Sequence, residues 1–267
     1  MKKVIITILI ILAILVLGLS GYLVYDKLID RDVESPIPEE KNELNEAKQV
    51  LEKFVIPENK GNVFKDGYTL QNKMILAYLN LSNEKMSDVS CKTIYNNLSM
   101  NEFSEYQVNL SLEGFSQGYC SDVTSAINYD DLNQSYKELF GNNQELPKVD
   151  FNYGFDLYDY NESTNQFILL SCNCGGRTSG FVVYGIKNVR VDGEELTISV
   201  AYTEFLESES LETYETIINN NKVVYNSSEV SESNFEKNFL DKYLNDMTEY
   251  NLIFVKQNGN YILKELK

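Results

Sequence analysis

Four cysteines are the most reactive side chains in the sequence, and they are Cys91, Cys120, Cys172 and Cys174. In an oxidising compartment four cysteines allow three disulfide connectivities, and the spacing alone does not choose among them. We predict structural disulfides, in which Cys91 bonds Cys120 or each of these two bonds one of Cys172 and Cys174. The alternatives are free thiols, a strained Cys172–Cys174 redox pair and a four-cysteine metal site, although the paired C-x-x-C spacing of zinc ribbons is missing.

A glycine-rich segment surrounds the last two cysteines. Residues 171–180 read Ser-Cys-Asn-Cys-Gly-Gly-Arg-Thr-Ser-Gly and contain one of only three arginines in the chain. Successive glycine amides can form a concave nest for an anion, and a guanidinium can hold a carboxylate or phosphate through two hydrogen bonds. The predicted ligand-binding residues are therefore Gly175, Gly176, Arg177 and Thr178. The alternative is a plain hairpin loop, because the run does not match a phosphate-loop motif.

Histidine is absent from the sequence, and this excludes Ser-His-Asp and Cys-His catalysis as well as the common zinc hydrolase motifs. Any enzyme here must use carboxylates, Lys, Tyr, Ser or Cys. The acidic run Glu204–Glu215 could offer paired carboxylates to a hydrolase or to calcium, but a solvated connection is the preferred interpretation. We assign no catalytic residue, no metal and no cofactor.

Acidic residues outnumber basic ones, with 40 Asp plus Glu against 23 Lys plus Arg and a formal net charge of −17. A field of this sign repels phosphate backbones and anionic lipid headgroups, so the charge argues against nucleic acid as a partner. Cations or basic cell-envelope partners are the class that this charge favours.

The N-terminus predicts a membrane anchor. Val4–Tyr25 runs for 22 residues without a charge, and at about 1.5 Å per residue a helix of this length reaches about 33 Å, enough to span a bilayer core. Lys2 and Lys3 precede it and acids follow, so we expect a single-pass protein in the cytoplasmic membrane with its C-terminal domain outside. A cleaved signal peptide followed by secretion is the alternative. The predicted division is 1–25 for the cytoplasmic stub and anchor, 26–38 for a spacer, and 39–267 for the extracytoplasmic domain.

Apolar residues at spacings of three and four predict helices. One helix carries a capping box from Ser233 to Glu236, another begins at the N-cap Thr69, and a third ends at Gly141. The predicted helices are Glu39–Val55, Thr69–Leu81, Asp130–Phe140 and Asn234–Met247.

Alternation with a period of two predicts strands after Pro147. Asp192-Gly193 and Asn258-Gly259 are typical of tight hairpin turns, whereas residues 86–128 hold no legible period. The predicted strands are Phe151–Leu157, Gln166–Cys172, Phe181–Val191, Leu196–Thr203, Glu249–Lys256 and Tyr261–Leu266. Helices followed by an antiparallel meander predict an α+β fold, with helices packed on a curved antiparallel sheet.

Two segments carry a resemblance, Asn128-Tyr-Asp-Asp-Leu-Asn-Gln-Ser-Tyr-Lys-Glu-Leu-Phe-Gly141 and Tyr250-Asn-Leu-Ile-Phe-Val-Lys-Gln-Asn-Gly-Asn-Tyr261. Together with the N-terminal anchor they resemble uncharacterised membrane-anchored extracytoplasmic proteins of AT-rich Gram-positive bacteria. The resemblance covers about a tenth of the chain and implies a location but no catalytic residue. In element order the predicted domain is also similar to the cone-shaped nuclear-transport-factor-like folds.

The function that these features favour is a non-enzymatic, membrane-anchored extracytoplasmic domain that binds or senses a partner. A Cys-dependent thiol-disulfide redox protein is the alternative, and a carboxylate-based hydrolase is a weaker one.

Overall fold

The computed structural model describes residues 38–56, 63–96, 98–101, 103–112, 114–172, 180–208 and 212–267. The predicted anchor Val4–Tyr25 lies outside these residues, as does the predicted spacer apart from Pro38. No helix in the described part of the chain is long and apolar enough to cross a membrane. The compact unit that carries both sheets runs from Leu44 to Lys267.

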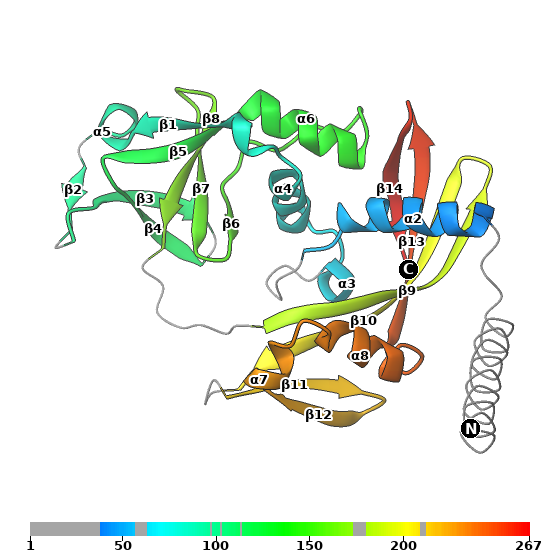
Figure 1. Cartoon of the computed structure of the whole chain (residues 1–267). Helices are drawn as coiled ribbons and strands as arrows, with labels where there is room; N and C mark the ends of the chain where they lie inside the picture. Colours follow the sequence, from blue (N-terminus) through cyan, green and yellow to red (C-terminus); the bar gives the residue numbers. More distant parts are fainter. Residues whose placement is uncertain are drawn as a thin grey trace, which may run out of the picture. The chain divides into compact units, whose positions relative to one another are not determined.

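The first sheet has eight antiparallel strands, in the order β1-β5-β8-β4-β3-β2 with β7 and β6 joined to β8 (Figure 1). β7 pairs along one edge of β8, while β5 and β4 share the other edge. The strands are β1 (Met86–Ser90), β2 (Ser99–Met100), β3 (Tyr106–Leu112), β4 (Phe115–Cys120), β5 (Val123–Asn128), β6 (Phe151–Tyr153), β7 (Asp156–Asn161) and β8 (Gln166–Ser171).

The second sheet has six antiparallel strands and is organised by the long strand β10 (Glu195–Glu207). β9 (Gly180–Asp192) pairs along one edge of β10, from Glu195 to Leu206. The other edge of β10 pairs first with β13 and then, at Leu206 and Glu207, with β11. The remaining strands are β11 (Thr213–Ile218), β12 (Asn221–Asn226), β13 (Thr248–Gln257) and β14 (Asn260–Leu266).

The helices bury their apolar sides against these sheets. One continuous core contains Leu51 of α2, Leu76 of α4, Leu132 of α6 and side chains from both sheets, such as Phe167 and Ile198. A separate core lies beneath α8 and includes Phe205 and Phe239. The α-helices are α2 (Pro38–Glu52), α3 (Val63–Asp66), α4 (Leu70–Leu79), α5 (Cys91–Ile94), α6 (Tyr129–Phe140), α7 (Ser227–Val230) and α8 (Phe235–Tyr243).

The predicted helices are confirmed, with one error at a cap. Thr69 caps α4 by accepting a hydrogen bond from the Asn72 amide at 3.2 Å. Gly141 ends α6 with a φ of 104°, a conformation that favours glycine. The capping box predicted from Ser233 to Glu236 is wrong, because α8 begins after Asn234 without a side-chain cap. The box that the structure does show lies at Asn226 and Glu229 and caps α7.

The two predicted hairpin turns are confirmed. Gly193 between β9 and β10 has a φ of 63°, and Asn258 and Gly259 between β13 and β14 have φ values of 51° and 88°. A hairpin that the sequence analysis did not predict joins β11 to β12 through Asn219 and Asn220, whose φ values are 49° and 62°. Asparagine tolerates this conformation better than most residues with a side chain, which explains the turn.

The α+β class is confirmed, but the prediction of one curved sheet is wrong. Residues 86–128, in which no period was legible, supply five strands of the first sheet, which is separate from the second. The strand predicted over Phe151–Leu157 is also wrong, because Gly154, with a φ of 63°, turns the chain and separates β6 from β7. The two sheets therefore differ from the single-sheet cone that the likeness to nuclear-transport-factor-like folds implies.

Gly118 in β4 provides a test of the packing in the first sheet. A Cβ atom at this position would lie 2.8 Å from Leu170 Cδ1 and 3.0 Å from Leu170 Cβ. We expect Gly118→Val to lower the free energy of unfolding by about 1–3 kcal/mol, because a close-packed site cannot take the added volume without shifting. Urea denaturation measures the effect, with Ser116→Val at an exposed position of the same strand as the control. Equal stability of the two variants would contradict this packing.

Candidate binding groove

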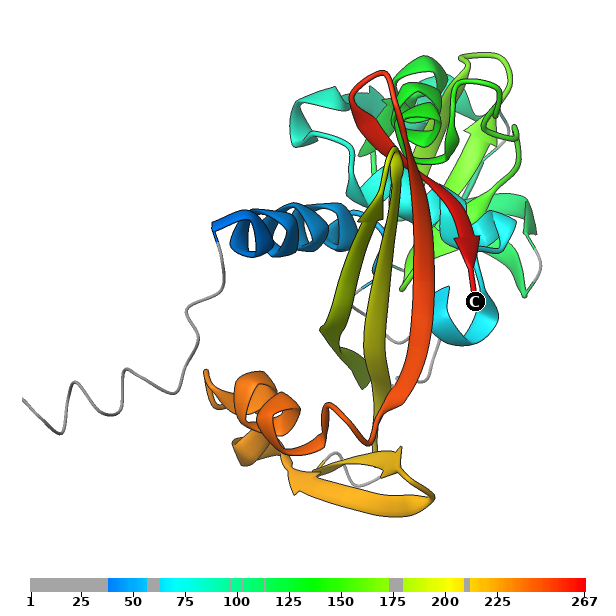
Figure 2. The same cartoon turned by 90° about the vertical axis from the view of Figure 1, so that its right-hand side faces the viewer.

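A groove of about 950 Å³ lies along β9 and is lined by α2 on one side and by the segment of α7 and α8 on the other. Figure 2 shows the backbone of these elements, with α2 above and the helices α7 and α8 below. Its floor is formed by β9 residues between Phe181 and Ile186. Leu44, Lys48, Leu51 and Glu52 of α2 form one wall. The opposite wall comes from Val230 of α7, Glu232 and Ser233, and the α8 residues Phe235, Glu236, Leu240 and Leu244 just beyond.

The floor of the groove is the edge of a sheet. Among the described residues, β9 pairs with β10 alone. Val182 belongs to the core that α2 covers, whereas Val183 belongs to the core beneath α8. Successive side chains of a strand point to opposite faces, so α2 covers one face of β9 and α8 covers the other. The edge of β9 between these two faces lines the groove.

Gly185 allows α8 to lie close to this strand. A Cβ atom on Gly185 would lie 2.7 Å from Leu244 Cδ1 and 3.1 Å from Leu240 Cδ2. The leucines occupy the space that a side chain at this position would need. This close approach brings Glu236, one turn before Leu240, to the groove.

The charged side chains of the groove are mostly acidic. Glu52, Glu232 and Glu236 line it against the single base Lys48. Burial raises the pKa of the Tyr184 phenol, and the negative charges of Glu52 and Glu236 raise it further. These two glutamates come from opposite walls of the groove, and the charges of both act on the same phenol. The groove therefore combines apolar walls with a negative potential.

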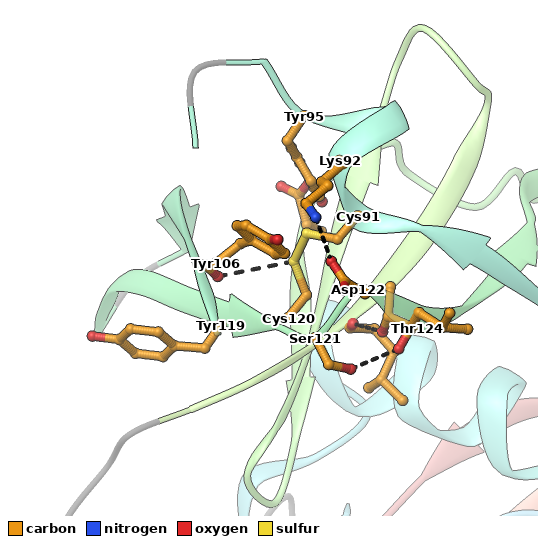
Figure 3. The surroundings of a disulfide bond; sticks show 12 residues. Cys91, Lys92, Tyr95, Tyr106, Tyr119, Cys120, Ser121, Asp122 and Thr124 are labelled. Carbon is orange, nitrogen blue, oxygen red and sulfur yellow. Dashed lines mark hydrogen bonds and ion pairs between the residues drawn. A yellow bond between two sulfur atoms is a disulfide. The ribbon is translucent and has the colours of Figure 1, made fainter. Parts of the chain in front are cut away.

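The disulfide between Cys91 and Cys120 joins the first residue of α5 to the last residue of β4 (Figure 3). The Cα atoms are 6.3 Å apart, and the two residues are 0% and 3% exposed. Lys92 lies beside the bond, with its Nζ 2.9 Å from Asp122 and 5.1 Å from the centre of the Tyr106 ring. A thiolate must reach a sulfur atom to exchange with it, so this buried bond is a structural cross-link.

This pairing confirms one of the predicted alternatives. The prediction of free thiols is wrong, since none of the described cysteines is free and Cys172 too is disulfide-bonded. A four-cysteine metal site is also wrong, because the sulfurs of Cys91 and Cys120 are bonded to each other rather than available as thiolates. Within the described ranges, no cluster of three or more potential ligands could hold a metal ion.

The predicted anion site falls where the structure does not describe the chain. Cys172 follows β8 and donates its amide to the Phe155 carbonyl at 3.0 Å. Cys174 and the predicted ligand-binding residues lie in 173–179, outside the described residues. The redox pair and the anion nest therefore stay predictions. The predicted ligand-binding residues that lie outside the described part of the chain are Gly175, Gly176, Arg177 and Thr178.

Three described acids of the run Glu204–Glu215 have separate partners. Glu204 lies 3.8 Å from Lys65, and Glu215 lies 2.6 Å from Lys222. Glu207 accepts a hydrogen bond from the Tyr214 hydroxyl at 3.4 Å. The separate partners do not pair these three carboxylates with one another. The prediction of a solvated connection is wrong at the two ends of the run, because Glu204 and Glu207 belong to β10 and Glu215 belongs to β11.

Asp159 of β7 is a half-buried carboxylate that ties the disulfide region to the sheet. The Tyr95 hydroxyl, just after α5, donates to Asp159 Oδ2 at 2.5 Å. Burial raises the pKa of the Asp159 carboxyl, the Tyr95 hydrogen bond lowers it, and the charge of Asp150 raises it again, with a raised pKa as the result. Folding therefore disfavours the charged form of the Asp159 carboxyl.

Comparison with known protein families, with curated proteins and with solved structures finds no match. The resemblance to membrane-anchored proteins of Gram-positive bacteria therefore stays a prediction.

The groove was not predicted from the sequence, because its residues come from three segments that are distant along the chain. A signal was present in Leu44, which shares the predicted apolar stripe of its helix but is 38% exposed in the structure. The continuous apolar run Phe181–Ile186 was a second signal. Neither pattern indicates which helix faces which strand, so the groove could not be assembled from them.

The Cys91–Cys120 bond should contribute to the stability of the first sheet. The bonded residues are 29 positions apart, and closing a loop of this length stabilises a fold by about 3–4 kcal/mol through the entropy of the unfolded chain. We expect Cys91→Ala/Cys120→Ala to lose about this much in denaturant unfolding. In the wild-type protein, mass spectrometry after native alkylation should find both residues unlabelled. Labelling of either residue without a reductant would contradict the cross-link.

The raised pKa of Asp159 predicts that replacing this carboxyl stabilises the protein, and that the stabilisation depends on pH. A carboxyl whose pKa is raised by folding destabilises the protein above that pKa, and the penalty disappears below the unfolded value of 3.8. Asp159→Asn keeps an acceptor for Tyr95, so we expect a higher melting temperature than wild type at pH 7. The difference should shrink as the pH falls toward 3.8. Asp88→Asn, at an exposed position of β1, is the control, and a less stable Asp159→Asn protein at pH 7 would refute the assignment.

Proposed function

We propose that the chain is a membrane-anchored extracytoplasmic binding or sensing domain whose groove along β9 takes a cationic, partly apolar ligand. The observation that carries this proposal is the placement of Glu52 and Glu236 on opposite walls of the groove, both acting on Tyr184 at its floor. A ligand that buries apolar surface between α2 and α8 must also satisfy these charges, and a positively charged group does so. The net charge of −17 favours the same class of partner at longer range.

Two features support the location. The disulfide between Cys91 and Cys120 is compatible with an oxidising compartment outside the cytoplasm. The uncharged run Val4–Tyr25, preceded by Lys2 and Lys3, has the length and charge asymmetry of an anchor that leaves the following domain outside.

A thiol-disulfide redox protein is the second candidate, and the state of Cys172 favours it. Cys172 is disulfide-bonded and only partly buried, whereas the Cys91–Cys120 bond is buried. Exchange chemistry needs an accessible sulfur, so Cys172 is the described cysteine that a reductant would reach first. The groove along β9 has no part in this activity.

Charge reversal in the groove tests the binding proposal. The probe is a fluorescent twelve-residue peptide with the repeat Lys-Lys-Val-Val, which as a strand presents both residue types on each face. A peptide with the repeat Glu-Glu-Val-Val is its counterpart. We expect the full chain in mild detergent to bind the basic peptide, with affinity falling as salt rises. Glu52→Lys/Glu236→Lys should weaken binding at least tenfold, because each new lysine repels the probe.

A matched control changes the net charge of the protein by the same amount. Glu84→Lys/Asp241→Lys alters two exposed acids outside the groove, and Asp241 lies on α8 like Glu236. We expect the dissociation constant of this control for the basic peptide to stay within about threefold of the wild-type value. Equal losses in both double variants, or preference for the acidic peptide, would overturn the proposal.

A further inference from the structure

We infer that the free edge of β9 pairs with an extended basic segment of a partner polypeptide, which adds a strand to the second sheet within the groove. This inference rests on the proposed function and specifies how the ligand is bound. Main-chain hydrogen bonds along the edge would supply affinity, and side-chain pockets on the two faces would supply selectivity.

The half of β9 that lines the groove lacks the usual protection of an edge strand. Natural edge strands avoid further pairing through charged side chains, prolines and bulges. Phe181–Ile186 contains no charge and no proline. The protective features are confined to the other half: the register of β9 shifts at Lys187, whose side chain pairs with Glu249 at 2.7 Å, and Arg190 and Asp192 follow.

The backbone of this half has hydrogen-bonding groups to offer. In an antiparallel strand, alternate residues direct their N–H and C=O groups toward one neighbour and the intervening residues toward the other. β10 occupies one side of β9, and no described strand occupies the other. The outward groups of Phe181–Ile186 thus face the groove, over a length of about 20 Å at about 3.3 Å per residue.

The walls are placed to receive side chains from both faces of an added strand. Side chains on one face of that strand would meet Leu51 and Glu52 of α2, and those on the other would meet Glu236 and Leu240 of α8. Each wall therefore offers an apolar surface next to a carboxylate. A segment that mixes Lys or Arg with apolar residues satisfies both walls at once.

Charge selects a basic partner chain over a second copy of this protein. Pairing two β9 edges would bring the acidic walls of both copies together, with Glu52, Glu232 and Glu236 from each. Like charges in a desolvated interface are unfavourable, and the net charge of −17 adds to the repulsion. Positive side chains on the incoming strand remove this penalty.

Selective N-methylation of the probe distinguishes strand addition from other modes of binding. An N-methyl group removes one backbone donor, and an added edge strand uses only one of its two edges. The Lys-Lys-Val-Val peptide is compared with an analogue methylated at every second residue and with one methylated at consecutive residues. With the full chain we expect the first analogue to bind within about threefold of the parent peptide, and the second to bind at least tenfold more weakly.

Amide hydrogen exchange gives an independent readout. Binding of the parent peptide should slow the exchange of alternate amides within Phe181–Ile186, because only these face the added strand. The amides of β12, a strand of the same sheet that does not line the groove, should exchange at unchanged rates.

The outcomes separate this inference from the proposed function. Binding that depends on Glu52 and Glu236, survives alternate methylation and is lost on consecutive methylation supports strand addition. Glutamate-dependent binding that is equal for all three peptides would overturn strand addition and leave the cationic groove in place. Loss of binding on alternate methylation would overturn it in favour of a helical ligand. Absence of glutamate-dependent binding would overturn both proposals, and self-association abolished by Glu52→Lys/Glu236→Lys would assign the edge to a second copy.

Discussion

Backbone pairing along β10 is the interaction on which the second sheet and the groove depend. β9 occupies one edge of β10 from end to end, while β13 and β11 divide the other edge between them. Among the described strands, β10 is the one neighbour that holds β9 in the sheet. Buried side chains alternate with half-buried ones from Glu195 to Val200 of β10, and a shift of register by one residue would move the buried set to the other face. The position of the free edge follows from this register.

Helix packing turns that edge into a groove. α2 lies against the face of β9 that carries Val182, and α8 lies against the face that carries Val183 and Gly185. Each helix buries apolar residues on one side and places glutamates beside the edge on the other. The same helices therefore stabilise the sheet and set the potential of the groove. Binding and folding are linked here, because a ligand held by both walls would also stabilise the packing of α2 and α8.

The first sheet is held together differently. The Cys91–Cys120 bond, the Lys92–Asp122 ion pair and the Tyr95–Asp159 hydrogen bond all act on the segment around α5. These strands are short, and several are largely exposed. Cross-links compensate where little apolar surface is buried. Burial raises the pKa of the Asp159 carboxyl and the Tyr95 hydrogen bond lowers it, so this hydrogen bond offsets part of the cost of burying the group.

Features decided within a few residues were readable from the amino-acid order, and features decided between distant segments were not. The turns at Gly193 and Gly259, the cap at Thr69 and the end of α6 at Gly141 depend on local backbone preferences, so they were predicted. The strands of 86–128 were not, because their burial depends on partners far along the chain and leaves no regular period. The sequence left the Cys91–Cys120 pairing as one alternative among several, because only the tertiary arrangement of α5 and β4 places the two cysteines side by side. The groove arose only in the tertiary structure, since no local pattern in α2, β9 or α8 specifies that two helices leave one strand edge open between them.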